Sequence, residues 1–94
     1  MKIDFTDISI PTGIDRRGAV RADVRREFAD VIYRMGSGID AHALSLKIYN
    51  AKGAEEYTES ECGLIRRYAE RCSPAFIDAM DELFNTNNNK EENV

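Results

Sequence analysis

Apolar residues recur at helical spacing in four segments of the chain, and in the second of them they are not confined to one side. This segment, residues 39–51, is apolar around most of a helical wheel, through Ile39, Ala41, Ala43, Leu44, Leu46, Ile48 and Tyr49. A helix that is apolar on several sides needs neighbours on several sides. We therefore predict that residues 39–51 form the central helix of a compact four-helix domain.

Each of the other three segments carries a single apolar stripe. The spacing of Val20, Val24 and Phe28 predicts an amphipathic helix over residues 19–35. A third helix, residues 59–71, is predicted to begin at a capping box in which Thr58 and Glu61 bind each other's backbone amides. The fourth, residues 74–85, follows a Ser-Pro pair that is typical of a helix start.

Residues 2–10 have the alternating pattern of a β segment. The alternation changes phase at residues 6–7, which indicates a bulge or two short strands. Because a lone strand leaves its backbone unpaired, we expect it to lie on the helices, form a hairpin with residues 12–18, or pair with a second copy. The predicted fold is therefore mainly α, with one domain over residues 1–85. The polar, asparagine-rich residues 86–94 are predicted to form a flexible tail.

Length and composition narrow the class of protein. A chain of 94 residues forms one domain that buries only about 60–65% of its unfolded surface, so self-association is one source of added stability. No apolar run reaches the ~18 residues of a membrane span, and acidic residues interrupt the first ten positions. We expect a cytoplasmic protein without a membrane partner. The net charge of −4 arises wholly from residues 73–94, which disfavours a non-specific nucleic-acid coat protein.

Two groups of arginines are the candidate interaction face. Arg17, Arg21 and Arg25 are spaced i, i+4 and i+8, so on a helix they would form one stripe, and Arg66 and Arg67 lie on the third predicted helix. Such groups can bind phosphates or an acidic protein partner. Acidic residues are interleaved with them, so a solvated face stabilised by ion pairs is a further interpretation.

The residues most often used in catalysis are few. Cys62 and Cys72 lie ten positions apart on one predicted helix, about 15 Å, too far for a disulfide. His42 is the only histidine, and the chain has no phosphate-binding loop, catalytic triad pattern or zinc motif. We therefore predict that the protein is not an enzyme and has no catalytic, metal or cofactor-binding residues. An enzyme would require one of these three side chains to line a pocket with a perturbed pKa.

Residues 43–84 contain the segments LSLKIYNAKG, EEYTESECGLIRRYAERC and SPAFIDAMDELF. They resemble the C-terminal part of a loose class of small proteins from bacteriophages, prophages and other mobile elements. That class has no activity or functional residues to transfer, and the resemblance implies a small accessory protein acting through contact with another protein. We predict a non-enzymatic protein–protein interaction module, with homodimer formation as one option, that binds through the arginine face or the strand edge at residues 2–10. The alternative is a nucleic-acid-associated regulator using the two arginine clusters.

Overall fold

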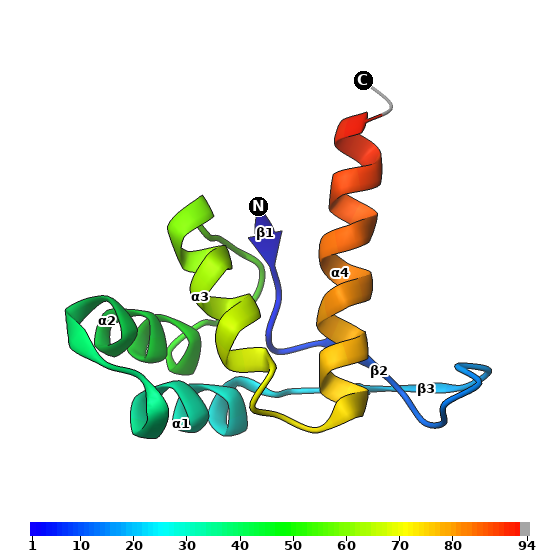
Figure 1. Cartoon of the computed structure of the whole chain (residues 1–94), viewed down its shortest axis with the longest axis horizontal. Coiled ribbons are helices and arrows are strands. Elements are labelled where there is room, and N and C mark those ends of the chain that lie inside the picture. The colour runs from blue at the N-terminus through cyan, green and yellow to red at the C-terminus, as the bar shows by residue number, and fades with distance from the viewer. Residues whose placement is uncertain (93–94) are drawn as a thin grey trace.

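The computed structural model describes the backbone of residues 1–92 and the side chains of residues 1–86. Within this range, four helices are combined with two small antiparallel sheets (Figure 1). The elements in chain order are β1 (Lys2–Ile3), β2 (Ile8–Pro11), β3 (Ala19–Ala22), α1 (Arg25–Met35), α2 (Gly38–Tyr49), β4 (Glu55–Glu56), α3 (Glu59–Ala69) and α4 (Pro74–Glu92). The predicted fold class is confirmed in part: four helices are present, but the strands form two small sheets and extend beyond one N-terminal segment.

The N-terminal segment lies at the centre of the molecule. The chain from β1 runs between α3 and α4, and α4 packs against β2 (Figure 1). Phe5, in the connection between β1 and β2, is fully buried, and its ring centroid lies 5.6 Å from that of Phe28 and 5.5 Å from that of Tyr57. Phe28 continues the cluster to Phe76 of α4, at 5.0 Å. Aromatic side chains bury large apolar areas. This cluster therefore joins the N-terminal segment, α1 and α4 in one core.

The β segment consists of two short strands, as the change of phase predicted. Strand β1 pairs antiparallel with β4, and β2 forms a hairpin with β3, in which Ile8 lies opposite Ala22 and Pro11 opposite Ala19. The predicted helix over residues 19–35 is therefore wrong in its first part, because residues 19–22 pair with β2. Helix α1 begins only at Arg25.

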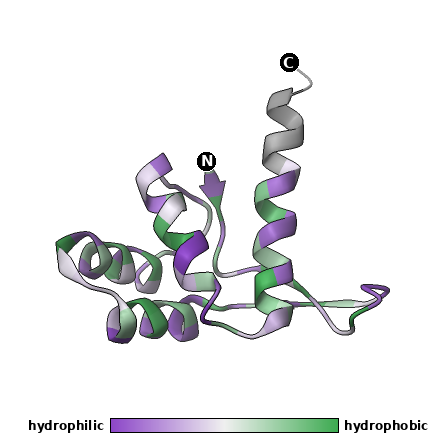
Figure 2. Ribbon diagram, in the orientation of Figure 1, coloured by the Kyte–Doolittle hydropathy of each residue, from purple (hydrophilic) through white to green (hydrophobic). Residues whose placement is uncertain are grey.

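The prediction that α2 is the central helix is also wrong. Helix α2 packs against α1, and only one side of it is buried, through Ala41, Leu44, Ser45 and Ile48. Ile39 is 86% exposed, Leu46 46% and Tyr49 53%. Figure 2 shows hydrophobic residues, in green, along α2 from its first to its last turn. The described chain thus supplies neighbours for only part of this apolar surface.

The two later helices start where the sequence indicated. The Thr58 hydroxyl accepts a hydrogen bond from the Glu61 amide, and the Glu61 carboxylate accepts one from the Thr58 amide, so the capping box is confirmed. The Ser73 hydroxyl likewise accepts from the Phe76 amide at the start of α4. Helix α4 continues to Glu92, beyond the predicted end at residue 85. The flexibility of residues 86–94 stays a prediction, and residues 93–94 lie outside the described residues.

Candidate interaction surface

Exposed apolar side chains gather on one pair of helices. Among the described residues, seven large apolar side chains are exposed, and two of them, Ile14 and Val20, lie on the β2–β3 hairpin. The other five lie on α1 and α2, and they are Tyr33, Met35, Ile39, Leu46 and Tyr49. Single exposed apolar side chains are normal on a protein surface, but a cluster marks an interaction site.

Helix α2 contributes a regular row to this cluster. Ile39, His42, Leu46 and Tyr49 are all exposed and are spaced i, i+3, i+7 and i+10, so they lie along one side of the helix. We call this row the outer stripe. The same spacing places the a and d residues of a coiled coil on the side that meets a partner helix. Helix α2 therefore has two apolar sides, of which one packs on α1 and the other is open.

A groove between α1 and α2 adjoins the outer stripe. Its volume is about 420 Å³, and its lining consists of Arg26, Ala29, Asp30, Tyr33, Ser45, Leu46 and Tyr49. We call the groove and the outer stripe together the α1–α2 face. The one buried polar side chain in the lining, Ser45, donates to the His42 carbonyl at 2.7 Å, so its hydroxyl is satisfied.

The two ends of the groove show that α1 and α2 run antiparallel. At one end the ring centroids of Tyr33 and His42 are 6.0 Å apart. At the other end Tyr49 and Arg26 also line a neighbouring hollow together. An aromatic ring thus stands at each end, and the groove carries one cation, Arg26, and one carboxylate, Asp30. This part of the surface has no net charge, unlike the chain as a whole.

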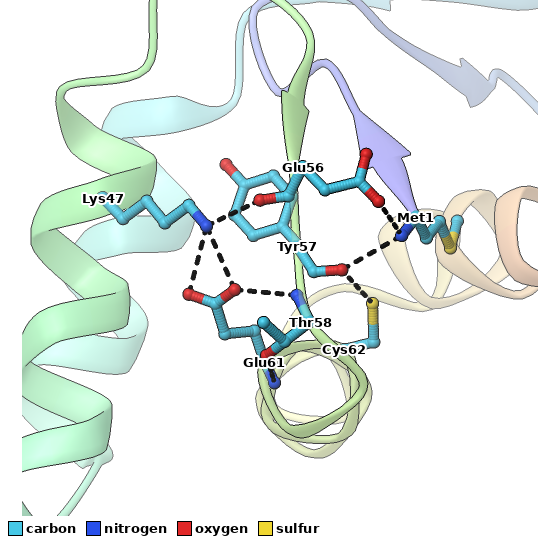
Figure 3. A network of polar contacts seen from close by, with 7 residues as sticks. All are labelled: Met1, Lys47, Glu56, Tyr57, Thr58, Glu61 and Cys62. Atoms are coloured by element: carbon cyan, nitrogen blue, oxygen red, sulfur yellow. Dashed lines mark hydrogen bonds and ion pairs between the residues drawn. The ribbon is translucent and has the colours of Figure 1, made fainter.

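A network of polar contacts fixes α2 to the elements behind it (Figure 3). Lys47 donates to the Glu56 carbonyl at 2.6 Å and to both carboxylate oxygens of Glu61, at 3.0 and 3.2 Å. The same ammonium group lies 4.4 Å from the centre of the Tyr57 ring. Burial alone would raise the pKa of Glu61, but the hydrogen bonds from Thr58 and Lys47 outweigh it and lower that pKa. Helix α2 is therefore held through Lys47, which leaves its outer stripe uncovered.

The same network continues to β1. The Met1 amino group donates to Glu56 Oε1 at 2.8 Å and to the Tyr57 carbonyl at 3.0 Å (Figure 3). Tyr57 is fully buried, its hydroxyl has no hydrogen-bond partner, and burial raises its pKa to about 12. A hollow of about 420 Å³ opens beside Met1 and Cys62, but the Tyr57 hydroxyl lies on the far side of the ring from Cys62 (Figure 3). The unpaired hydroxyl therefore offers no contact to a molecule in that hollow.

The predicted arginine stripe does not form, because residues 19–24 are not helical. Arg17 lies in the hairpin loop, Arg21 on β3 and Arg25 at the start of α1. Arg21 donates to the Asp7 carboxylate at 2.6 and 2.9 Å, and these hydrogen bonds lower the pKa of Asp7. Arg25 binds Asp23 and also the Ala51 carbonyl, at 2.5 Å.

Of the remaining arginines, Arg17 lies 3.9 Å from Asp15, as a loose ion pair. Arg66 and Arg67 are neighbours on α3, as predicted; the Arg66 guanidinium lies 4.4 Å from the centre of the Phe84 ring, and Arg67 is exposed. The five arginines therefore lie in four parts of the fold, and Arg17, Arg21 and Arg25 have carboxylate partners within the chain.

The side chains with potential for chemistry do not form a reactive centre among the described residues. Cys62 and Cys72 are free, partly buried thiols that each line a surface hollow, and burial raises the pKa of each. A raised pKa favours the protonated thiol, which is the unreactive form. His42 is exposed beside Tyr33. In the described part of the chain, no three His, Cys, Asp or Glu residues are grouped so that they could hold a metal ion. None of the helices described has both the length and the apolar character needed to cross a membrane.

Sequence reasoning missed the α1–α2 face, although the sequence contained a signal for it. Residues 39, 42, 46 and 49 have the spacing of an interface within a segment that is apolar on several sides. Comparison of the chain with protein-family models, curated proteins and solved structures finds no match. The function must therefore be argued from the geometry of the surface.

Proposed function

We propose that the protein is a non-enzymatic protein–protein interaction module and that the α1–α2 face is the surface through which it associates. One observation carries this proposal: Ile39, Leu46 and Tyr49 of the outer stripe are apolar, lie at helical spacing and stay 86%, 46% and 53% exposed within the described chain. A helix that is apolar on two sides is stabilised when both sides are covered. The second neighbour comes, in this proposal, from another protein molecule.

The composition of the face favours binding to protein. Tyr33 and Tyr49 stand at the two ends of the groove, and tyrosine is among the residues that most often carry the binding energy of an interface. Leu46 lies between them and is 46% exposed. Burial of apolar surface stabilises an interface by roughly 25 cal/mol per Å². Because the Ser45 hydroxyl already donates a hydrogen bond within the chain, it stays paired when a partner displaces water from the groove.

The setting of this function is part of the same proposal. The resemblance of residues 43–84 to small proteins of bacteriophages and mobile elements supports an accessory role in such a system, in the cytoplasm. The alternative, a nucleic-acid-associated regulator, receives less support because Arg21 and Arg25 are each bound to a neighbouring aspartate.

Affinity capture from the native host, with and without nuclease, tests the proposal. Three forms of the tagged full chain are compared: the wild type, Leu46→Glu on the α1–α2 face, and Ile14→Glu as a matched control. Ile14 is 99% exposed at the hairpin loop, so its variant makes the same change of charge and polarity away from the face. We expect the wild type and the control to retain the same nuclease-resistant protein, and Leu46→Glu to lose it.

Two results would overturn the proposal. Equal capture by all three forms would mean that association uses another surface. Loss of every captured species after nuclease treatment would favour the nucleic-acid alternative instead. Circular dichroism of each purified variant, with helix content equal to that of the wild type, shows that a loss of binding is not a loss of folding.

A further inference from the structure

We propose that the molecule covering the α1–α2 face is a second copy of this chain, packed so that each α1 lies on the α2 of the other copy in an antiparallel four-helix bundle. The inference rests on the proposed function, since it takes the α1–α2 face to be an association surface. It adds the identity of the partner and the arrangement of the four helices.

The charge of the face is the first argument for a second copy. The chain carries a net charge of −4, so two copies repel each other at most orientations. The groove, however, holds one arginine and one aspartate and is neutral. Two such faces can therefore approach without a like-charge penalty. A strongly charged partner would find no complementary charge there.

The positions of the aromatic residues give the arrangement. A two-fold axis parallel to the helices would place α1 of one copy against α2 of the other. Each residue and its symmetry mate would then lie at the same height along the bundle axis. Tyr33 and His42 are at one height, and Arg26 and Tyr49 are at another. In the dimer, Tyr33 would meet His42 of the second copy, and Arg26 would meet the ring of Tyr49 of the second copy. An arginine over a tyrosine ring is a favourable contact, stronger when water is excluded.

The direction of the helices fits the same axis. Because α1 and α2 run antiparallel, an α1 that is stacked on the second copy's α2 is also antiparallel to it. All neighbouring helices in the bundle then alternate in direction, as in up-and-down four-helix bundles. The a and d spacing of the outer stripe supplies the side chains that such bundles interleave at their interfaces.

Sedimentation equilibrium of the purified full chain tests the inference. We expect a dimer for the wild type and for Ile14→Glu. Leu46→Glu and, as a second and milder variant, Tyr33→Ser should each raise the dimer dissociation constant more than about tenfold. Both replaced side chains are largely exposed, at 46% and 63%, so the helix content of the variants should match the wild type.

The outcomes separate this inference from the proposed function. A monomeric wild type at all accessible concentrations, with host capture still lost in Leu46→Glu, would overturn the second copy and leave the proposed function standing. A dimer unaffected by both face variants would overturn the inference, because the copies would then meet elsewhere. If capture were also unaffected by Leu46→Glu, the proposed function would fail together with it.

Discussion

Two alanine substitutions on α2 distinguish its buried side from its open side. Ile48 is fully buried, and removing a buried isoleucine to alanine costs about 2–5 kcal/mol. Leu46 is 46% exposed, so only about half of its side chain is removed from water within the chain. Full burial of a leucine is worth about 1.5–3 kcal/mol, and Leu46→Ala should therefore cost about 1 kcal/mol in the isolated chain.

The stability of each variant is then compared at two protein concentrations. Association with a second copy stabilises the folded chain by mass action, so a contact made only in the dimer contributes only when the dimer is populated. Urea unfolding at a dilute and a concentrated protein level measures both contributions. We expect the loss in Ile48→Ala to be large at both levels and the loss in Leu46→Ala to grow with concentration.

The reasoning would be refuted in either of two ways. If Leu46→Ala cost as much as Ile48→Ala in dilute protein, α2 would be surrounded by its own chain. If the cost of Leu46→Ala were small and the same at both concentrations, the outer stripe would contribute nothing to self-association.

Three further predictions follow from single contacts. Thr58→Ala should cost about 1 kcal/mol and lower the melting temperature by about 4–8 °C in a thermal scan, while Thr58→Ser should keep the cap and most of the stability. The pKa of Glu61 is lowered from 4.5 in the folded chain, so the stability that its carboxylate contributes is complete above pH 4.5 and is lost as the pH falls through the folded-state pKa. Glu61→Gln should therefore remove this part of the loss of stability in acid, measured by urea unfolding at pH values from 7 to 3. An unchanged dependence of stability on pH in Glu61→Gln would contradict this prediction. The proposed dimer places Arg26 of one chain beside Tyr49 of the other. When chains that lack the native cysteines and carry either Arg26→Cys or Tyr49→Cys are mixed and mildly oxidised, we expect a disulfide between one chain of each kind. Predominant disulfides between two Arg26→Cys chains would mean that α1 lies on α1 of the other copy.

Local signals in the sequence predicted the starts of α3 and α4 well. The capping box at Thr58 and the Ser-Pro pair before α4 depend on residues three or four positions apart, and both are present as predicted. The division of the β segment at residues 6–7 was also visible, because a change of phase is a local feature.

The errors concern relations between distant segments. The spacing of Val20, Val24 and Phe28 fits a helix, but residues 19–22 pair with β2 and form a strand. A hairpin from residues 2–10 was one expectation, but its second strand was placed at residues 12–18 instead of 19–22. The helical stripe of Arg17, Arg21 and Arg25 does not form for the same reason, because it depended on a helix that includes Arg21. Binding of a partner by the arginines stays a prediction.

The position of α2 was misjudged for a different reason. An apolar helix indicates that neighbours exist, but it does not indicate which molecule supplies them. The sequence of residues 39–51 is equally compatible with a helix at the centre of one chain and with a helix between two chains. The exposures of Ile39, Leu46 and Tyr49 decide for the open arrangement in the described structure.

The most direct test of the association surface is hydroxyl-radical footprinting of the wild-type chain at increasing protein concentration. The label reports the solvent exposure of individual side chains without any substitution. We predict that Tyr33, Leu46 and Tyr49 become protected as concentration rises, while Ile14 keeps the same labelling throughout. Unchanged labelling of all four, or protection of Ile14 alone, would contradict the packing of a second copy of this chain on the α1–α2 face.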